Sequence, residues 1–108
     1  MARAQADKAA AGRMAALGDP MRRAIFEMLA EGPRSVGDIA DKLPVTRPAV
    51  SQHLKVLSEA GLIAHDTVGT RNLYRIEPER VAEVRDYLDQ LWQKAMSNLK
   101  SRIEKPHQ

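Results

Sequence analysis

The chain has 108 residues, of which 44% are hydrophobic and 29% charged, so we expect one folded domain rather than two domains or a disordered chain. The absence of cysteine excludes disulfides, thiolate nucleophiles, iron–sulfur clusters and cysteine-based zinc sites. A net charge of +3 favours a polyanionic partner, and an aromatic content of 4% favours duplex over single-stranded nucleic acid, which is bound by base stacking.

Two helices are predicted at the start of the chain. An alanine-rich stretch over residues 2–17 carries a narrow apolar stripe at helical spacing, which indicates a first helix with little burial. Asp19 can cap a second helix, and Pro20 suits its first turn because the missing N–H would have no partner there. Gly32 and Pro33 then end this second helix.

A helix-turn-helix pattern follows over about residues 35–60. Ser35 and Asp38 match a capping box, which begins a short third helix. Thr46 offers a cap oxygen for a fourth helix over about residues 47–60. The apolar positions of that helix recur at i, i+4 and i+7 and are Val50, Leu54 and Leu57. In this arrangement the second helix enters the major groove of duplex DNA and the first crosses the backbone.

The outward surface of the fourth helix is polar and cationic. Because the apolar residues point inward, Arg47, Ser51 and Lys55 form an outward row, with Pro48, Gln52 and Glu59 beside it. Gln52 can make a bidentate bond to adenine, Arg47 can reach guanine or phosphate, and Lys55 suits a phosphate. The alternative interpretation is that these residues are only the solvated face of an amphipathic helix.

A hairpin is predicted next, because two β-prone runs, 62–68 and 72–76, flank Gly69. A wing would therefore cover about residues 62–76. Three polar side chains lie at or after its turn, namely Arg71, Asn72 and Arg75. A wing at this place meets the adjacent minor groove or the DNA backbone, so two separate polar elements would converge on the duplex.

The last predicted helix, over about residues 78–104, begins at Pro78 and is apolar along one face for about six turns. That face consists of Val81, Val84, Leu88, Leu91, Ala95, Leu99 and Ile103, widened by Tyr87, Trp92 and Met96. A domain this small has little use for so long an apolar helix, so we infer a partner surface, most simply for a second copy of the chain. The alternative is that Tyr87 and Trp92 line a pocket for an organic effector.

Several segments together resemble the ArsR-type winged helix-turn-helix transcriptional repressors. They are residues 19–23 (DPMRR), 35–36 (SV), 47–57 (RPAVSQHLKVL), 60–63 (AGLI) and 69–74 (GTRNLY), and the run SQHLKVL is the most specific. The resemblance covers about residues 14–91. The predicted elements form a single mainly α domain over residues 1–108 with a small β-hairpin, in the order α-α-α-α-β-β-α, and the resemblance implies the same fold. The resemblance further implies a homodimer formed through the first and last helices, and a palindromic operator that often lies in the regulator's own promoter.

The resemblance also assigns site residues. It maps the DNA contacts of the recognition helix and wing onto Thr46, Arg47, Ser51, Gln52, His53, Lys55, Arg71 and Asn72, and the faces described above add Pro48 and Arg75. The dimer interface is predicted at Met14, Leu17, Leu88, Leu91, Trp92, Ala95 and Leu99. For His53 a pH-sensitive role, or simple proximity to the hydrophobic packing, stays open beside DNA contact.

Many such repressors respond to metals held by cysteines on the third helix or by Asp and His pairs on the last helix. This chain departs from both patterns, since residues 35–40 hold no thiol and neither Asp86 nor Asp89 has a nearby histidine. Pro106 interrupts the spacing from Glu104 to His107. We therefore expect no metal site and no cofactor, and the alternative is a sensor of a small molecule or an unanticipated metal.

Other function classes are disfavoured by missing patterns. The sequence contains no phosphate-binding glycine loop and no metalloprotease motif, so we expect no enzyme. It shows no signal peptide and no membrane span, which predicts a cytoplasmic protein without a membrane partner. A helical protein-interaction module, similar to an antitoxin, is the alternative from another class, because its long apolar helix would bind another protein.

Overall fold

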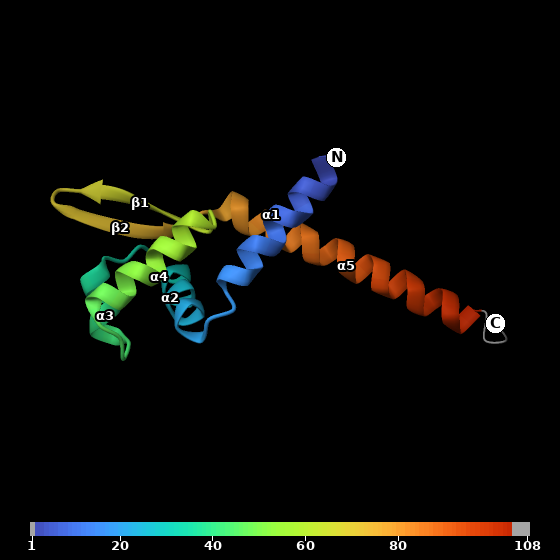
Figure 1. Cartoon of the computed structure of the whole chain (residues 1–108), viewed down its shortest axis with the longest axis horizontal. Coiled ribbons are helices and arrows are strands. Elements are labelled where there is room, and N and C mark those ends of the chain that lie inside the picture. The colour runs from blue at the N-terminus through green and yellow to red at the C-terminus, as the bar shows by residue number, and fades with distance from the viewer. Residues whose placement is uncertain (1, 105–108) are drawn as a thin grey trace.

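The computed structural model of the protein describes residues 2–104. Its elements are α1 (Ala2–Ala16), α2 (Pro20–Ala30), α3 (Val36–Lys42), α4 (Arg47–Glu59), β1 (Ile63–Val68), β2 (Arg71–Ile76) and α5 (Pro78–Glu104). The predicted order α-α-α-α-β-β-α is confirmed, as is the mainly helical fold with a small hairpin. Figure 1 shows the hairpin at one end of the molecule and α5 extending away from the body at the other.

Three helices begin where the sequence places their caps. The Asp19 carboxylate accepts a bond from the Arg22 backbone N–H at 2.9 Å, which caps α2. At α3 the Asp38 backbone N–H donates to the Ser35 hydroxyl and the Ser35 backbone N–H donates to the Asp38 carboxylate, both at 3.2 Å. The Thr46 hydroxyl accepts from the Ala49 N–H at 3.3 Å and caps α4. These bonds satisfy backbone donors that a helix start leaves without partners.

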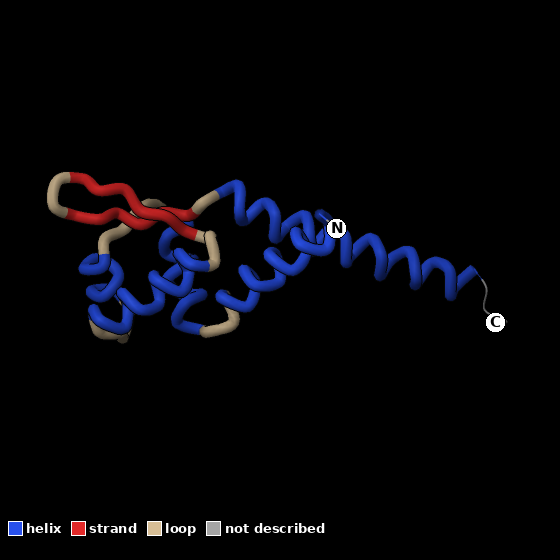
Figure 2. Tube along the Cα trace, turned by 45° about the horizontal axis from the view of Figure 1, so that its top comes forward, coloured by secondary structure: helices blue, strands red, loops and turns tan. Residues whose placement is uncertain are grey.

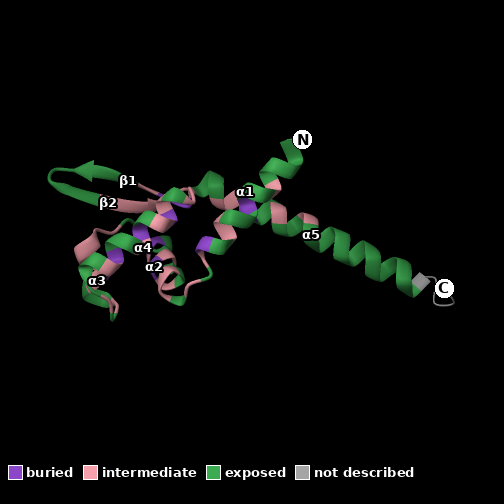
Figure 3. Cartoon of the chain, in the orientation of Figure 1, coloured by how far each residue is buried: buried purple, intermediate pink, exposed green. Residues whose placement is uncertain are grey.

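The hydrophobic core lies between α2, α3, α4 and the base of the hairpin, as Figure 3 shows by burial. Its fully buried large side chains are Val50, Leu54 and Leu57 of α4, Ile25 of α2, Ile39 of α3 and Leu62. The inward direction predicted for the apolar residues of α4 is therefore confirmed. This packing leaves the opposite face of α4 to the solvent.

The first helix has the little burial that its sequence predicts, because only Ala10 and Ala16 of its 15 residues are buried. The spacing predicts an apolar stripe at Ala6, Ala10, Met14 and Leu17; of these Ala10 is 1% exposed, Met14 and Leu17 are partly buried, and Ala6 is exposed. Figures 1 and 2 show that α1 crosses the first half of α5. Alanine side chains are small, so α1 buries little apolar area per residue where it crosses α5.

The hairpin, called the wing from here on, pairs β1 with β2 in antiparallel register, with Ile63 opposite Ile76 and Val68 opposite Arg71. Gly69 turns the chain with φ +65°, a conformation that favours glycine. Arg34, two residues before α3, exchanges two backbone bonds with Tyr74 of β2, at 3.0 and 2.8 Å. The wing is thereby attached to the start of the helix-turn-helix.

The second half of α5 makes few contacts with its own chain. Every residue from 91 to 103 is exposed, whereas Val84 near the start of α5 is buried. Figure 3 shows this half in green along its visible length. Among residues 2–104, no helix combines the length and the apolar character that crossing a membrane requires.

Candidate nucleic-acid interface

The polar side chains of α4 form one exposed surface. Arg47, Pro48, Ser51, Gln52 and Lys55 are all exposed, as predicted for the outward row and its neighbours. Their helix is held from behind by Val50 and Leu57, each 0% exposed, and by Leu54 at 1%. A helix anchored this firmly holds the backbone positions of its polar side chains in a constant arrangement, which suits insertion into a groove.

The start of α4 is packed against α3 by Arg47. A Cβ atom placed on Gly37 would lie 3.1 Å from the Arg47 Nη2 atom, so the guanidinium lies almost directly over the backbone of α3. Gly37 thus makes room for Arg47 at the turn between the two helices. Sequence reasoning missed this role for Gly37, because the two residues are ten positions apart and belong to different helices.

His53 differs from the outward row, because it is only partly exposed and lies within the electrostatic range of Asp19. The pKa of Asp19 lies below its ordinary value of 3.8, chiefly because the Arg22 N–H bonds to the carboxylate, with a smaller contribution from His53. His53 therefore sits on the flank of α4 near the start of α2. DNA contact by His53 stays a prediction.

The wing residue Arg71 is tied to the start of α3. Its Nη2 atom donates to the Ser35 hydroxyl at 2.9 Å and to the Asp38 carboxylate at 3.2 Å. The pKa of Asp38 is lowered, first by the Ser35 backbone N–H, then by the Ser35 hydroxyl, with a smaller effect of Arg71. The neighbouring Asn72 accepts a bond from the Thr67 hydroxyl at 3.0 Å.

Arg75 lies closer to the base of the wing and is held by two carboxylates. Its Nε atom donates to Asp66 at 2.8 Å and its Nη1 atom donates to Glu77. These bonds, that to Asp66 first, raise the pKa of Arg75 above its ordinary value. Arg75 thus links the two strands and the start of α5, and sequence spacing alone had grouped it with the residues at the wing turn.

A groove of about 470 Å³ brings the two predicted DNA-binding elements together. It runs between α3, the start of α4 and the wing. Its lining residues are Ser35, Val36, Gly37, Asp38, Asp41, Arg47, Thr70, Arg71, Asn72 and Tyr74. Arg47 of the helix and Arg71 and Asn72 of the wing, predicted separately, therefore border one surface.

The residues predicted for a dimer interface divide into two groups. Leu88, Leu91, Trp92, Ala95 and Leu99 of α5 are exposed, and with Met96 and Ile103 they form what we call the apolar stripe of α5. Trp92 is 60% exposed and Ile103 is 68% exposed. Met14 and Leu17, in contrast, are partly buried against the core of their own chain, so less of their surface is left for a partner.

Comparison with known proteins places the chain in a family. A helix-turn-helix domain family matches residues 17–66. An HTH-type transcriptional regulator of Mycobacterium tuberculosis is 48% identical over 89 residues, which are 82% of this chain and 83% of the relative. An ArsR-like transcriptional regulator from Rhodococcus is 28% identical and superposes with a TM-score of 0.76 over 87% of this chain and 92% of that one. The chain belongs to the ArsR family of transcriptional regulators.

Another ArsR-family structure adds an assembly state. The homodimeric winged helix-turn-helix DNA-binding domain of a possible ArsR-family regulator from Mycobacterium bovis, solved in solution, is 33% identical to this chain. It superposes with a TM-score of 0.65 over 81% of this chain and 80% of that domain.

In this ArsR-family chain, residues 2–104 contain no group of three or more His, Asp or Glu side chains placed to share one metal ion. That the regulator needs no metal stays a prediction.

Proposed function

We propose that this ArsR-family regulator is a homodimeric repressor that binds a palindromic site in double-stranded DNA. The observation that carries the proposal is α4, whose apolar face is buried in the core while its polar face is exposed beside the wing. Two copies of α4 would occupy successive major grooves about 10 base pairs apart. A dimer bound in this way covers one face of the duplex and blocks polymerase.

Within α4 we assign different roles to the exposed side chains. Gln52 makes a bidentate bond to adenine, and Ser51 donates to or accepts from a neighbouring base edge. Arg47 reaches guanine or a phosphate from the start of the helix, and Lys55 binds a phosphate. Thr46 and Pro48 flank this set, and the exposure of all these residues supports the assignment.

In the wing, we assign a phosphate contact to Arg71. A guanidinium has five N–H donors, and the contacts of Arg71 among the described residues use Nη2 alone. Its side chain is 59% exposed, so the other donors can reach a phosphate while Asp38 holds the group in place. Asn72 adds an exposed amide beside it. Arg75 shares its guanidinium with two carboxylates, so we expect it to contribute less to DNA binding than Arg71.

For the dimer, we assign the apolar stripe of α5 to a second copy of the chain. The middle of α5 carries Asp86 and Asp89, and its last turns carry Lys100 and Arg102. An antiparallel pair of α5 helices would place the acidic segment of each copy near the basic segment of the other, which a parallel pair would not. The homodimeric domain from Mycobacterium bovis supports a dimer, without indicating which helices pair.

The experiment is a fluorescence anisotropy titration on duplex from the region upstream of the protein's own gene, against scrambled duplex of the same composition. Titrations over a series of salt concentrations, with and without EDTA, measure phosphate contacts and metal dependence. We expect tighter binding to the upstream duplex, unchanged by EDTA. Equal weak binding to both duplexes would contradict the idea that the protein regulates its own gene from this upstream region.

A pair of lysine variants tests the surface itself. Lys55→Ala on α4 removes a proposed phosphate contact, so the slope of log affinity against log salt should fall by about one. Lys94→Ala makes the same chemical change at an exposed position of α5, outside the proposed DNA surface, and should leave the slope unchanged. Equal effects of the two substitutions would refute the assignment of α4 as the DNA-binding helix.

A further inference from the structure

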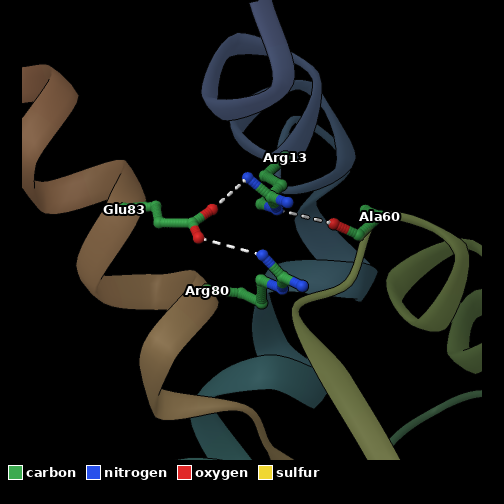
Figure 4. Close-up of polar contacts among 4 residues, drawn as sticks. All are labelled: Arg13, Ala60, Arg80 and Glu83. Carbon is green, nitrogen blue, oxygen red and sulfur yellow. Dashed lines mark hydrogen bonds and ion pairs between the residues drawn. The ribbon is translucent and has the colours of Figure 1, made fainter. Parts of the chain in front are cut away.

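Arg13 of α1 connects the end of α4 with α5. Its Nε atom donates to the backbone carbonyl of Ala60 at 3.1 Å, and its Nη1 atom donates to the Glu83 carboxylate at 2.7 Å. The other oxygen of Glu83 accepts from Arg80 at 2.9 Å. Figure 4 shows the Glu83 carboxylate facing both guanidinium groups. The Arg13 side chain is only 13% exposed, although it is charged.

The bond to Ala60 satisfies a carbonyl at the C-terminal end of α4. Ala60 is the C-cap of that helix, and carbonyls at this end have no partner within the helix. They also carry partial negative charge, which a guanidinium stabilises. Gly61 then turns the chain with φ +78°, and a Cβ atom there would lie 3.5 Å from the Arg13 Nε atom. The end of α4 is thus capped by a residue of another helix.

This contact links the two halves of the proposed function. The proposed dimer surface is on α5, which α1 crosses, whereas the proposed DNA surface is on α4. Apolar packing through Ala16 and Val84 also joins α1 and α5 to the core. Apolar packing has little directional preference, whereas hydrogen bonds from a planar guanidinium fix both distance and angle.

We propose that Arg13, oriented by Glu83, is a positioning residue that sets the direction of α4 relative to α1 and α5. The direction of α4 in turn sets the spacing between half-sites that the dimer accepts. This inference rests on the proposed function, because spacing has a meaning only for a dimer on DNA. One added base pair moves a half-site by about 3.4 Å and rotates it by about 35°. A loosely held α4 would tolerate such a change, and a fixed α4 would not.

The first test measures the position of α4 without DNA. Because the chain has no cysteine, cysteines introduced at Lys55 on α4 and Gln93 on α5 can carry spin labels, with labelled chains diluted into unlabelled ones. Arg13→Gln should broaden the distribution of label distances within one chain. Arg80→Gln, which also loses a bond to Glu83 but none to α4, should leave the width unchanged. An unchanged width in Arg13→Gln would overturn the proposal.

The second test measures spacing preference on duplexes whose half-sites are moved apart or together by one and two base pairs. For Arg13→Gln we expect discrimination between the best spacing and its neighbours to fall about two- to fivefold, the range that one charge at a helix end provides. If Arg13 only stabilised the fold, Arg13→Gln would weaken binding equally to duplexes of every spacing, and that result would overturn the proposal. If Arg13→Gln does not fold, Glu83→Gln, at a half-exposed position, should likewise lower the discrimination between half-site spacings.

The two tests separate this inference from the function on which it rests. If the wild-type protein bound no duplex specifically, the proposed function would be refuted. The distances between the spin labels would then be the only test of whether Arg13 positions α4. Specific wild-type binding with a spacing profile that Arg13→Gln and Glu83→Gln both leave unchanged would refute the inference and leave the proposed function standing.

Discussion

Leu99→Asp should dissociate the proposed dimer without disturbing the fold of the monomer. Leu99 is 50% exposed and belongs to the half of α5 that has no buried residue, so the substitution removes no contact from the core. Complete burial of a leucine side chain contributes about 1.5–3 kcal/mol, so burial of the remaining half contributes about 0.75–1.5 kcal/mol. Two copies lose about 1.5–3 kcal/mol per dimer, which corresponds to a dissociation constant about 10- to 150-fold higher.

Trp92 provides the assay, because it is the only tryptophan of the chain. Its side chain is 60% exposed in the monomer and lies in the same apolar stripe. Burial in the interface should shift its emission to shorter wavelength, and dilution should reverse the shift. Leu99→Asp should move this transition to a higher protein concentration, and sedimentation velocity gives the assembly state independently.

Ser97→Asp is the matched control, because it adds the same charge two residues away on the opposite face of α5. We expect it to leave dimerisation nearly unchanged. If Leu99→Asp and Ser97→Asp shift the dissociation constant equally, charge alone is responsible and the apolar stripe is not the interface. A Leu99→Asp protein that stays dimeric at wild-type concentrations would also refute the assignment.

Three further predictions concern the DNA surface and the helix caps. Gln52→Ala should cost about 1–3 kcal/mol on the operator and relax one base position in a selection from random duplexes, and equal weakening on scrambled DNA would show that Gln52 does not contact a base specifically. Arg71→Ala should lower the salt slope by about one, whereas an unchanged slope would remove Arg71 from the phosphate contacts. Because bonding lowers the pKa of Asp19 in the folded protein below 3.8, its cap stabilises the fold above that pH and the stabilisation is lost as the pH falls through the lowered pKa. Asp19→Ala should therefore be less stable than wild type in urea at neutral pH, and the difference should shrink in acid, so a pH-independent difference would refute the argument.

Much of the fold follows from interactions that act over a few residues. The N-caps at Asp19, Ser35 and Thr46 each bond a backbone N–H three residues ahead, so the sequence shows both partners at once. The spacing of Val50, Leu54 and Leu57 likewise indicates the buried face of α4, and the exposed outward row follows from it. The family resemblance, which rests on such local segments, was confirmed by comparison with known proteins.

The sequence by itself therefore determined the order of the elements, their starts and which face of α4 is polar. Only the tertiary structure decided how Arg13 and Arg71 are used, because their partners are far away in the chain. Arg71 bonds Ser35 at a separation of 36 residues, and Arg13 bonds Ala60 and Glu83 at separations of 47 and 70. No local periodicity encodes such pairs, and a long flexible side chain can reach several partners until packing places one of them beside it.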